Sequence, residues 1–300
     1  MNLKDTTIIG AGPAGIAAAI QLRRYGLDIA LFEKDSIGGL LCNANLIENY
    51  PGFPGGITGR EMVRQFEKSL AVFVDDVIFE EVGLLDYRQD YFIAESDTRQ
   101  VRSRAAIIAT GTRPLTFGDI DFSEDVRKRV FYEIAPLLEE RNKTIAIVGA
   151  GDAAFDYALN LTRPGLSNRV RIVNRSDRVK ALPLLQERVK RQTAIDYVPD
   201  SLLKTITMDD QGRLSVEYDR AGSVATLHVD FLVFAVGREP ELSLLSDGLQ
   251  KKMSELQQKG LLHLAGDVKN DIFRQSAISV GQGVMAAMEI YRQVKDHTKD

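Results

Sequence analysis

Short apolar runs rich in β-branched residues alternate with longer amphipathic stretches along most of the chain. Residues 6–9 predict a strand, and residues 16–25, which are rich in Ala, Leu and Ile, predict a helix that ends at Gly26. A second apolar run at 27–32 predicts the next strand, which ends at Glu33. This order of strand, helix and strand is typical of α/β domains built on a parallel sheet.

A glycine-rich turn joins the first predicted strand to the first helix. Residues 10–15 read Gly-Ala-Gly-Pro-Ala-Gly, the pattern G-x-G-x-x-G. In such a turn Gly10 permits the tight bend, Gly12 lets the backbone approach a pyrophosphate, and Gly15 lets the helix pack closely on the sheet. The helix N-terminus attracts the pyrophosphate, and Glu33, 18 residues after Gly15, is placed to bind ribose hydroxyls. The residues assigned to this dinucleotide site are Gly10, Gly12, Pro13, Ala14, Gly15 and Glu33.

The same plan recurs in the middle of the chain. A predicted strand at 144–148 leads into a G-x-G-x-x-A turn at 149–154, then a helix and a strand at 170–173 that ends at Asn174 and Arg175. No acidic residue stands at this strand end. An Arg there accommodates a 2′-phosphate and favours NADP over NAD, although a solvated charge is the alternative interpretation. The residues assigned to this second site are Gly149, Gly151, Asp152, Ala153, Asn174 and Arg175.

Both halves also continue alike. Each has a stretch of short alternating strands, at 77–101 and 205–229, followed by an apolar strand that closes on glycine, at 105–110 and 231–236. Arg and Pro follow the glycine in each half: Gly111 with Arg113 and Pro114, and Gly237 with Arg238 and Pro240. This internal repeat predicts two Rossmann-like dinucleotide-binding domains in one α/β chain.

Composition sets limits on the remaining possibilities. The 300 residues are 44% hydrophobic and 27% charged, and the formal net charge of −4 is too mild to indicate nucleic-acid or membrane binding. No apolar run reaches the ~18 residues of a membrane helix, and the N-terminus lacks a signal-peptide pattern, so we expect a cytoplasmic protein. Cys42 is the only cysteine, which excludes an intrachain disulfide, and we expect no metal site.

The chain resembles the thioredoxin-reductase-like branch of flavoproteins that have two dinucleotide-binding domains. The similar segments are residues 10–15 with Glu33, 38–40, 48–52, 59–62, 109–111, 266–267 and 274–277. The resemblance implies that the N-terminal site binds FAD, that the second binds NADPH or NADH, and that the protein is a homodimer. It implies further FAD contacts from Gly39, Leu40, Asn49, Thr110, Gly111, Gly266, Asp267, Arg274, Gln275, Ser276 and Ala277, and coenzyme contacts from Lys180, Gly237 and Arg238.

One departure from this family changes the expected chemistry. A thioredoxin reductase carries a C-x-x-C pair upstream of the second glycine turn, where this chain has Glu133 and Pro136 within 130–136. Without a dithiol the usual relay from flavin to disulfide cannot operate. The related thioredoxin-reductase-type ferredoxin or flavodoxin NADP reductases also lack the pair, but we do not expect their C-terminal extension here. Only Arg175 and Lys180 match the family's NADPH signature.

We therefore expect an NAD(P)H-dependent flavin oxidoreductase with a discontinuous FAD domain, residues 1–115 and 242–300, and an inserted NAD(P) domain, residues 116–241. The basic stretch 163–191 is either a docking face for an acidic partner such as ferredoxin or flavodoxin, or a solvated face. A helix at 282–294 is expected to aim its N-terminus at the flavin.

Three residues leave the catalytic chemistry open. Cys42 is either the thiol of a disulfide or peroxide reductase or a small packed side chain. Tyr50 either lies against the flavin or packs as an ordinary aromatic residue, and Glu133 is either a general acid or a surface carboxylate. A flavin-binding sensor or partner protein without enzymatic activity is the remaining alternative.

Overall fold

The computed structural model describes residues 3–116, 122–220 and 222–296, and the chain divides into two compact units. The terminal unit contains Met1–Cys42, Glu48–Arg113 and Glu239–Asp300. The inserted unit contains Asn43–Ile47 and Pro114–Arg238. No sequence pattern indicates that the five residues after Cys42 belong to the inserted unit.

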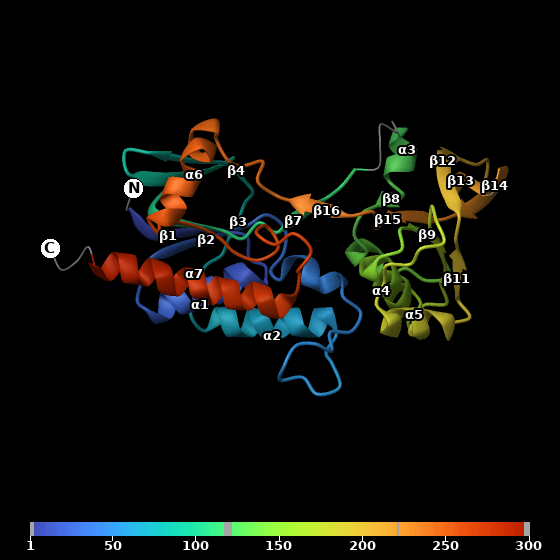
Figure 1. Ribbon diagram of the computed structural model, residues 1–300, viewed down its shortest axis with the longest axis horizontal. Coiled ribbons are helices and arrows are strands. Elements are labelled where there is room, and N and C mark those ends of the chain that lie inside the picture. Colours follow the sequence, from blue (N-terminus) through green and yellow to red (C-terminus); the bar gives the residue numbers. More distant parts are fainter. Residues whose placement is uncertain (1–2, 117–121, 221, 297–300) are drawn as a thin grey trace. The chain divides into compact units, whose positions relative to one another are not determined.

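A seven-stranded sheet forms the centre of the terminal unit (Figure 1). Its strands are β1 (Lys4–Ile9), β2 (Ile29–Glu33), β3 (Ile78–Phe79), β4 (Val82–Arg88), β5 (Tyr91–Ser96), β6 (Gln100–Ile108) and β17 (Leu262–Leu264). The order is β3-β2-β1-β6-β5-β4, and β17 pairs with the end of β6. Strands β1, β2, β3, β6 and β17 run parallel to their partners in this group, whereas β4, β5 and β6 form an antiparallel meander.

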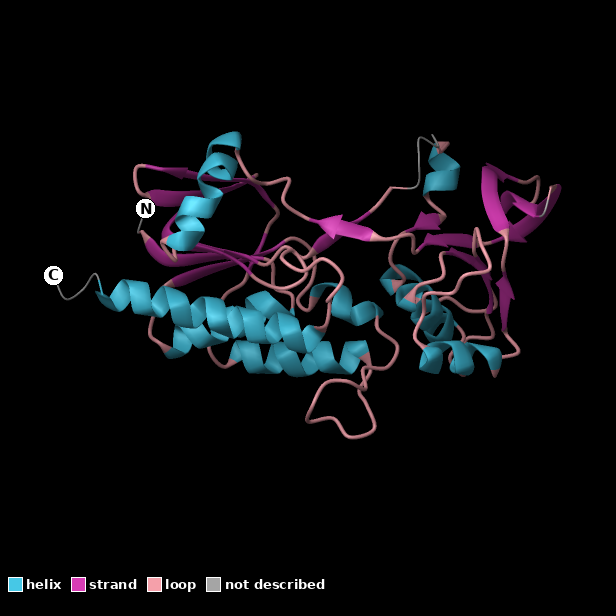
Figure 2. Ribbon diagram, viewed as in Figure 1, coloured by secondary structure: helices cyan, strands magenta, loops and turns pink. Residues whose placement is uncertain are grey.

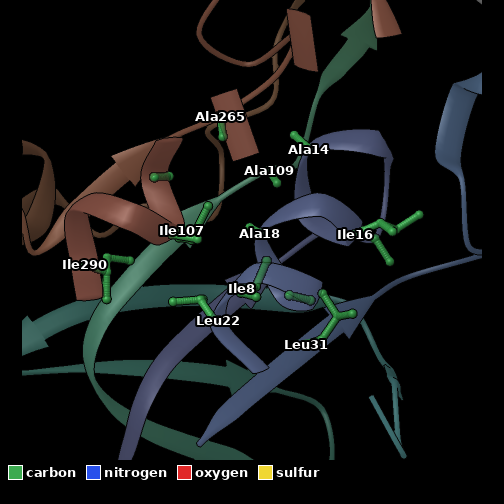
Figure 3. Packing of buried hydrophobic residues seen from close by; sticks show 14 of the residues in the cluster. Ile8, Ala14, Ile16, Ala18, Leu22, Leu31, Ile107, Ala109, Ala265 and Ile290 are labelled. Atoms are coloured by element: carbon green, nitrogen blue, oxygen red, sulfur yellow. The ribbon is translucent and has the colours of Figure 1, made fainter. Parts of the chain in front are cut away.

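Helices cover both faces of this sheet (Figure 2). They are α1 (Pro13–Arg24), α2 (Gly59–Ala71) and α7 (Ser276–Asp296) on one face and α6 (Asp247–Gln258) on the other, with a short 3-10 helix η1 at Gly39–Asn43. Figure 3 shows Ile8, Leu22, Leu31, Ile107 and Ile290 packed between the sheet and helices α1 and α7. Because side chains alternate along a strand, Ile9 next to Ile8 points to the opposite core beneath α6.

The crossing of α1 and α7 depends on a glycine. A Cβ atom at Gly283 would lie 2.1 Å from the carbonyl oxygen of Ala14, so only glycine permits this approach. Tyr25 and Tyr291 stack further along the same pair, with ring centroids 4.0 Å apart. The start predicted for this helix, residue 282, is wrong: the helix begins at Ser276, and Gly281, just before the predicted start, lies inside it without ending it.

The inserted unit has a five-stranded parallel sheet and a three-stranded antiparallel sheet. The parallel strands are β8 (Val130–Phe131), β9 (Thr144–Val148), β10 (Arg169–Val173), β11 (Ile195–Val198) and β15 (Phe231–Phe234), in the order β11-β10-β9-β15-β8. The antiparallel strands are β12 (Ser201–Met208), β13 (Leu214–Arg220) and β14 (Ser223–Val229). The helical segments are α3 (Glu124–Arg127), η2 (Ala135–Leu137), α4 (Asp152–Leu161) and α5 (Pro183–Lys190).

Two cores hold the inserted unit together. Ile145 and Ile147 of β9 pack toward α4, whereas the alternate residues Ala146 and Val148 pack toward the three-stranded sheet. Two short strands, β7 (Thr112–Pro114) and β16 (Arg238–Pro240), pair where the chain passes from one unit to the other. The strands expected at 105–110 and 231–236 end two residues early, at Ile108 and Phe234, because the backbone then turns toward glycine.

Substitution of Gly283 by alanine tests the close helix crossing. We expect Gly283→Ala to lower the free energy of unfolding by about 1–3 kcal/mol, because the new methyl group collides with backbone. The matched control is Gly281→Ala in the same helix, where no atom lies within 4 Å of a new Cβ. There the gain in helix propensity is expected to raise stability by about 0.5–1 kcal/mol. Equal effects of the two substitutions in urea unfolding would contradict this account.

Candidate dinucleotide sites

The glycine turn of the terminal unit is built by two close backbone approaches. Gly10 has φ +102°, and a Cβ there would lie 2.4 Å from the carbonyl oxygen of Ala109 at the end of β6. A Cβ at Gly15 would lie 1.8 Å from the carbonyl oxygen of Gly10. At Gly12, by contrast, no atom lies within 4 Å of a Cβ position. The second glycine therefore borders open space of the kind a pyrophosphate requires, next to the uncapped N-terminus of α1.

The inserted unit repeats this construction. Gly149 has φ +139°, and a Cβ there would lie 2.3 Å from the carbonyl oxygen of Ala235, just beyond β15. Gly151 borders open space, and α4 begins beside it without a side-chain cap. In both sheets the turn follows the strand at which the strand order reverses, where α/β proteins bind their ligands. Both turns therefore fit a dinucleotide.

Glu33 is fixed at the end of β2 beside the first glycine turn. The side chain is buried, and its two oxygens accept hydrogen bonds from the backbone N–H of Ala11 at 2.7 Å and of Asp35 at 3.0 Å. Each carboxylate oxygen has a second lone pair, so the group retains the capacity to accept from ribose hydroxyls. The local backbone thus positions this carboxylate for a role in binding.

The C-terminal motif lies against the same turn. Gly266 has φ +83°, and a Cβ there would lie 3.0 Å from the Cβ of Ala14. The backbone N–H of Gly266 donates to Gln282 Oε1 at 2.8 Å, and Ser279 Oγ donates to Asp267 Oδ1 at 3.3 Å. The first turns of α7 therefore hold Asp267 next to the start of α1.

Other predicted FAD contacts join this neighbourhood through hydrogen bonds. Asn49 Nδ2 donates to Gln275 Oε1 at 2.6 Å, which brings two predicted contact residues together across 226 positions of sequence. Arg274 Nε donates to the carbonyl oxygen of Asn270 at 3.4 Å. Ser276 and Ala277, also predicted contacts, form the first turn of α7.

Some predicted residues have structural partners that sequence reasoning did not anticipate. Thr110 Oγ1 donates to the carbonyl oxygen of Glu241 at 2.6 Å, and Gly111 accepts from the N–H of Glu241 at 3.1 Å. These bonds tie the returning chain to the end of β6. Tyr50 packs against Phe53 and Phe66, with ring centroids 6.0 and 6.2 Å away, and burial raises its pKa.

The residues of η1 differ in their exposure. Leu40 is exposed, whereas Cys42 is half-buried and its Sγ lies 3.2 Å from the carbonyl oxygen of Gly39, to which it donates. This contact with the helix backbone fits a small packed side chain at position 42.

A loop after β10 is held against the second glycine turn. Asn174 is buried, and its Nδ2 donates to the carbonyl oxygens of Ser176 at 2.7 Å and Arg178 at 3.1 Å. Asp152 Oδ1 accepts from the N–H of Leu182 at 2.7 Å, and the N–H of Lys180 donates to Ala150. These bonds shape the loop beside the second glycine turn.

Three exposed cations project from this loop and its continuation: Arg175, Arg178 and Lys180. Among the residues that the structure describes, no acidic side chain pairs with any of them. The arrangement suits a phosphate group beyond the end of β10. Ala153, another predicted contact, is exposed in the first turn of α4.

Glu133, which replaces a cysteine of the dithiol, is not a free surface carboxylate. It forms an ion pair with Arg238, and its Oε2 accepts hydrogen bonds from Asn43 Nδ2 and Tyr157 Oη, both at 2.9 Å. Asn43 Oδ1 in turn accepts from the N–H groups of Ile134 and Ala135 at 3.1 and 2.8 Å, which fixes the start of η2. Pro136, at the other cysteine position, lies within η2.

Sequence reasoning missed Asn43, Tyr157 and Asp156. Their partners are distant in the chain: Asp156 accepts the backbone N–H of Asn45 at 2.8 Å, across 111 positions. Burial raises the pKa of Asp156 from 3.8 to about 6. For Asp156 and Tyr157, the only signal in the sequence was their place in the helix after the second glycine turn; Asn43 had no such signal.

Comparison with known proteins places these features in a family. A sequence model described as pyridine nucleotide-disulphide oxidoreductase matches residues 4–262. The chain belongs to the pyridine nucleotide-disulphide oxidoreductase family. It is therefore an NAD(P)H-dependent flavin oxidoreductase, and thioredoxin-reductase-family proteins bind FAD and use NADPH.

Several proteins that the chain resembles are thioredoxin reductases. The mitochondrial thioredoxin reductase 1 of Arabidopsis thaliana is 32% identical over 94% of this chain and 81% of its own length. The thioredoxin reductase of Eremothecium gossypii is 31% identical, over 94% of this chain and 95% of its own length. The structure of Lactococcus lactis thioredoxin reductase is 28% identical with a TM-score of 0.84, covering 98% of this chain and 99% of the other. These findings confirm the predicted α/β fold.

Within the described ranges, no group of three or more His, Cys, Asp or Glu side chains is placed to hold a metal ion. Over the same part of the chain, no helix has the length and apolar character needed to span a membrane.

The raised pKa of Asp156 predicts a pH dependence of stability. A carboxyl group whose folded pKa is about 6 stabilises the fold below its ordinary pKa of 3.8 and loses this contribution as the pH rises through 6. Asp156→Asn has no ionisable group at this position and so lacks this loss of stability. We expect the free energy of unfolding of the variant, relative to that of the unaltered protein, to rise by about 2 kcal/mol between pH 4.5 and 7.5. Urea unfolding at both pH values measures this, with the exposed Asp177→Asn as control. A difference that does not change with pH would refute the prediction.

Proposed function

We propose that the protein catalyses hydride transfer from NADPH, bound by the inserted unit, to FAD, bound by the terminal unit, and then delivers electrons to a small acidic redox protein such as ferredoxin or flavodoxin. The observation that carries this proposal is the pair of glycine turns, each with one glycine bordering open space. The bound flavin would accept two electrons with the hydride and release them to the acceptor.

The residues proposed to hold FAD belong to the terminal unit. The N-terminus of α1 and Gly12 bind the pyrophosphate, and Glu33 accepts from the adenosine ribose. Asp267, held by Ser279, accepts from the ribityl hydroxyls, and the start of α7 supplies N–H groups near the flavin. These groups orient the cofactor and favour negative charge on it after reduction.

Preference for NADPH over NADH is supported by the loop after β10. Arg175 is the first residue after Asn174 at the strand end, where an acidic residue would repel a 2′-phosphate. Arg178 and Lys180 add positive charge on the same loop, which Asn174 and Asp152 hold in place. The chain thus differs from the family's arginine-rich signature but keeps cations at the corresponding place.

The acceptor is proposed to be a redox protein, because the chain has no dithiol to reduce a disulfide by the usual relay. Cys42 is its only cysteine, and Glu133 occupies one of the two cysteine positions. Exposed cations of the inserted unit, Arg178 and Lys190 among them, favour association with an acidic surface. Electrostatic attraction of this kind mainly raises the rate of encounter, and salt weakens it.

We also propose that the protein is a homodimer. Helix α7 presents Ile278, Met285 and Met288 on one side, each 39–57% exposed, while its opposite side packs against α1. These three residues, with Gly281 between them, follow the spacing of one helix face. Sedimentation velocity is expected to give the mass of two chains; the mass of one chain would refute this assembly.

Two matched substitutions test which glycine turn binds FAD and which binds NADPH. An alanine methyl at Gly12 or Gly151 meets no protein atom and suits the extended backbone there, so both variants are expected to fold. Each methyl would instead occupy the place of a pyrophosphate. We expect Gly12→Ala to lose most of its FAD on purification. Gly151→Ala should keep its FAD but need roughly tenfold more NADPH for half-maximal flavin reduction, about 1.4 kcal/mol of lost binding.

The outcome of this test is read from flavin absorbance of the purified proteins and from anaerobic titration. The unaltered protein is the control for both variants. Loss of FAD from both variants, or from neither, would contradict the assignment of one nucleotide to each unit.

Reduction rates with a panel of ferredoxins and flavodoxins test the acceptor. We expect turnover above background with at least one of them, falling as ionic strength rises. Cys42→Ser is expected to keep the full rate, because the proposed route uses no thiol. Background rates with every acidic protein would refute the redox-protein acceptor, and loss of activity in Cys42→Ser would favour single-thiol chemistry.

A further inference from the structure

Two charged side chains meet beyond the ends of neighbouring strands in the inserted unit. Strands β9, β15 and β8 lie side by side and run parallel. The glycine turn follows β9, Arg238 follows β15, and Glu133 follows β8. The ion pair of Glu133 and Arg238 therefore stands at the carboxyl edge of the sheet, next to the proposed pyrophosphate site.

The strand order indicates which half of a dinucleotide this pair would meet. Strand β10, with Arg175 beyond its end, lies on one side of β9, and strands β15 and β8 lie on the other. A dinucleotide whose pyrophosphate lies at Gly151 and whose adenosine phosphate lies at Arg175 must extend its other half across β15 toward β8. The pair is thus on the nicotinamide side of the glycine turn.

The contacts of Glu133 fix its orientation without enclosing it. Asn43 and Tyr157 each donate to its Oε2 at 2.9 Å, and Arg238 approaches its Oε1. Burial raises the pKa of Tyr157 well above its ordinary value, so this hydroxyl stays a donor at physiological pH. The Glu133 side chain is 25% exposed and that of Arg238 is 20% exposed, which leaves part of each group open to a ligand.

We propose that Glu133 and Arg238 together recognise the carboxamide of the nicotinamide ring. A carboxamide presents one N–H₂ donor and one carbonyl acceptor side by side. A carboxylate next to a guanidinium offers the complementary acceptor and donor, because each carboxylate oxygen has two lone pairs and a guanidinium has five N–H donors. This inference rests on the proposed function, since it requires a pyridine nucleotide in the inserted unit.

The proposal assigns a function to Glu133, which stands at a cysteine position of the dithiol pattern. A cysteine of a C-x-x-C pair at position 133 would exchange electrons, whereas a carboxylate there is redox-inert and makes a fixed polar contact. Glu133 is then a specificity residue for the coenzyme, held by Asn43 and Tyr157.

A coenzyme analogue separates this role from a structural one. The probe is the reduced 3-acetylpyridine analogue of NADPH, in which a methyl group replaces the carboxamide N–H₂. Dissociation constants for NADPH and the analogue come from anaerobic stopped-flow flavin reduction. We expect the unaltered protein to prefer NADPH by roughly tenfold or more, as for a hydrogen bond to a charged group.

Glu133→Gln is expected to lose most of this preference, because a neutral amide oxygen is a weaker acceptor for the carboxamide N–H₂ than a carboxylate. Arg238→Lys keeps the charge but lacks the planar fork that would meet the carbonyl, which NADPH and the analogue share, so it is expected to weaken both coenzymes and to keep the preference. The matched control is Glu139→Gln, which alters another carboxylate of the inserted unit that pairs with an arginine, Arg163. It should keep the preference of the unaltered protein.

The outcomes distinguish this inference from the proposed function. If NADPH fails to reduce the flavin of the unaltered protein, the proposed function is overturned and this inference with it. If NADPH reduces the flavin but the unaltered protein shows no preference, if Glu133→Gln keeps the preference, or if Arg238→Lys binds both coenzymes as tightly as the unaltered protein does, the inference alone is overturned. If Glu133→Gln binds both coenzymes equally more weakly and has a lowered melting temperature, Glu133 is a purely structural residue, and the inference is likewise overturned.

Discussion

Both dinucleotide sites depend on one backbone constraint, the approach of a glycine to the end of the neighbouring strand. Gly10 lies against Ala109 and Gly149 against Ala235, each so close that a Cβ would fall within 2.4 Å of a carbonyl oxygen. This contact fixes the turn, and the turn fixes where the following helix begins. The uncapped helix N-terminus and the open side of the second glycine then face the same space. The ligand site therefore results from backbone packing that permits only glycine at the first position of the turn.

At the place where the sequence predicts the dithiol of related proteins, this chain has a carboxylate with polar contacts. Glu133 lies at a cysteine position of the dithiol pattern, but its partners Arg238, Tyr157 and Asn43 make it part of a hydrogen-bonded network. A partly buried carboxylate with three partners is costly to leave unsatisfied, so the network also orders the loop that leads into η2. The same residues therefore link the structure of the inserted unit to its proposed coenzyme specificity.

Local patterns in the sequence were sufficient to predict the fold, because strand, glycine turn and helix follow one another within about 25 residues. The strand at Thr144–Val148 was predicted to the residue. The internal repeat of strand, glycine turn and helix predicted two dinucleotide-binding domains. The start of α7 was misplaced because Gly281 precedes residue 282 and glycine normally weakens a helix, whereas the helix runs through Gly281 from Ser276.

The partners within the sites could not be predicted in the same way. Asn43 meets Glu133 across 90 positions, and Arg238 meets it across 105. Such pairings depend on tertiary packing, and a single sequence carries no local signal for them. For the same reason the hydrogen bonds by which Asn174 and Asp152 hold the loop after β10 could not be predicted from the sequence.

The central claim, that a pyridine nucleotide in one unit reduces a flavin in the other, is tested most directly by anaerobic titration of the purified protein with NADPH and, separately, NADH. Flavin absorbance reports the reaction without any assumption about the acceptor. The account predicts bleaching by NADPH at low concentration and a need for much more NADH, because the cations beyond β10 are proposed to bind a 2′-phosphate. Flavin that neither coenzyme bleaches would contradict it.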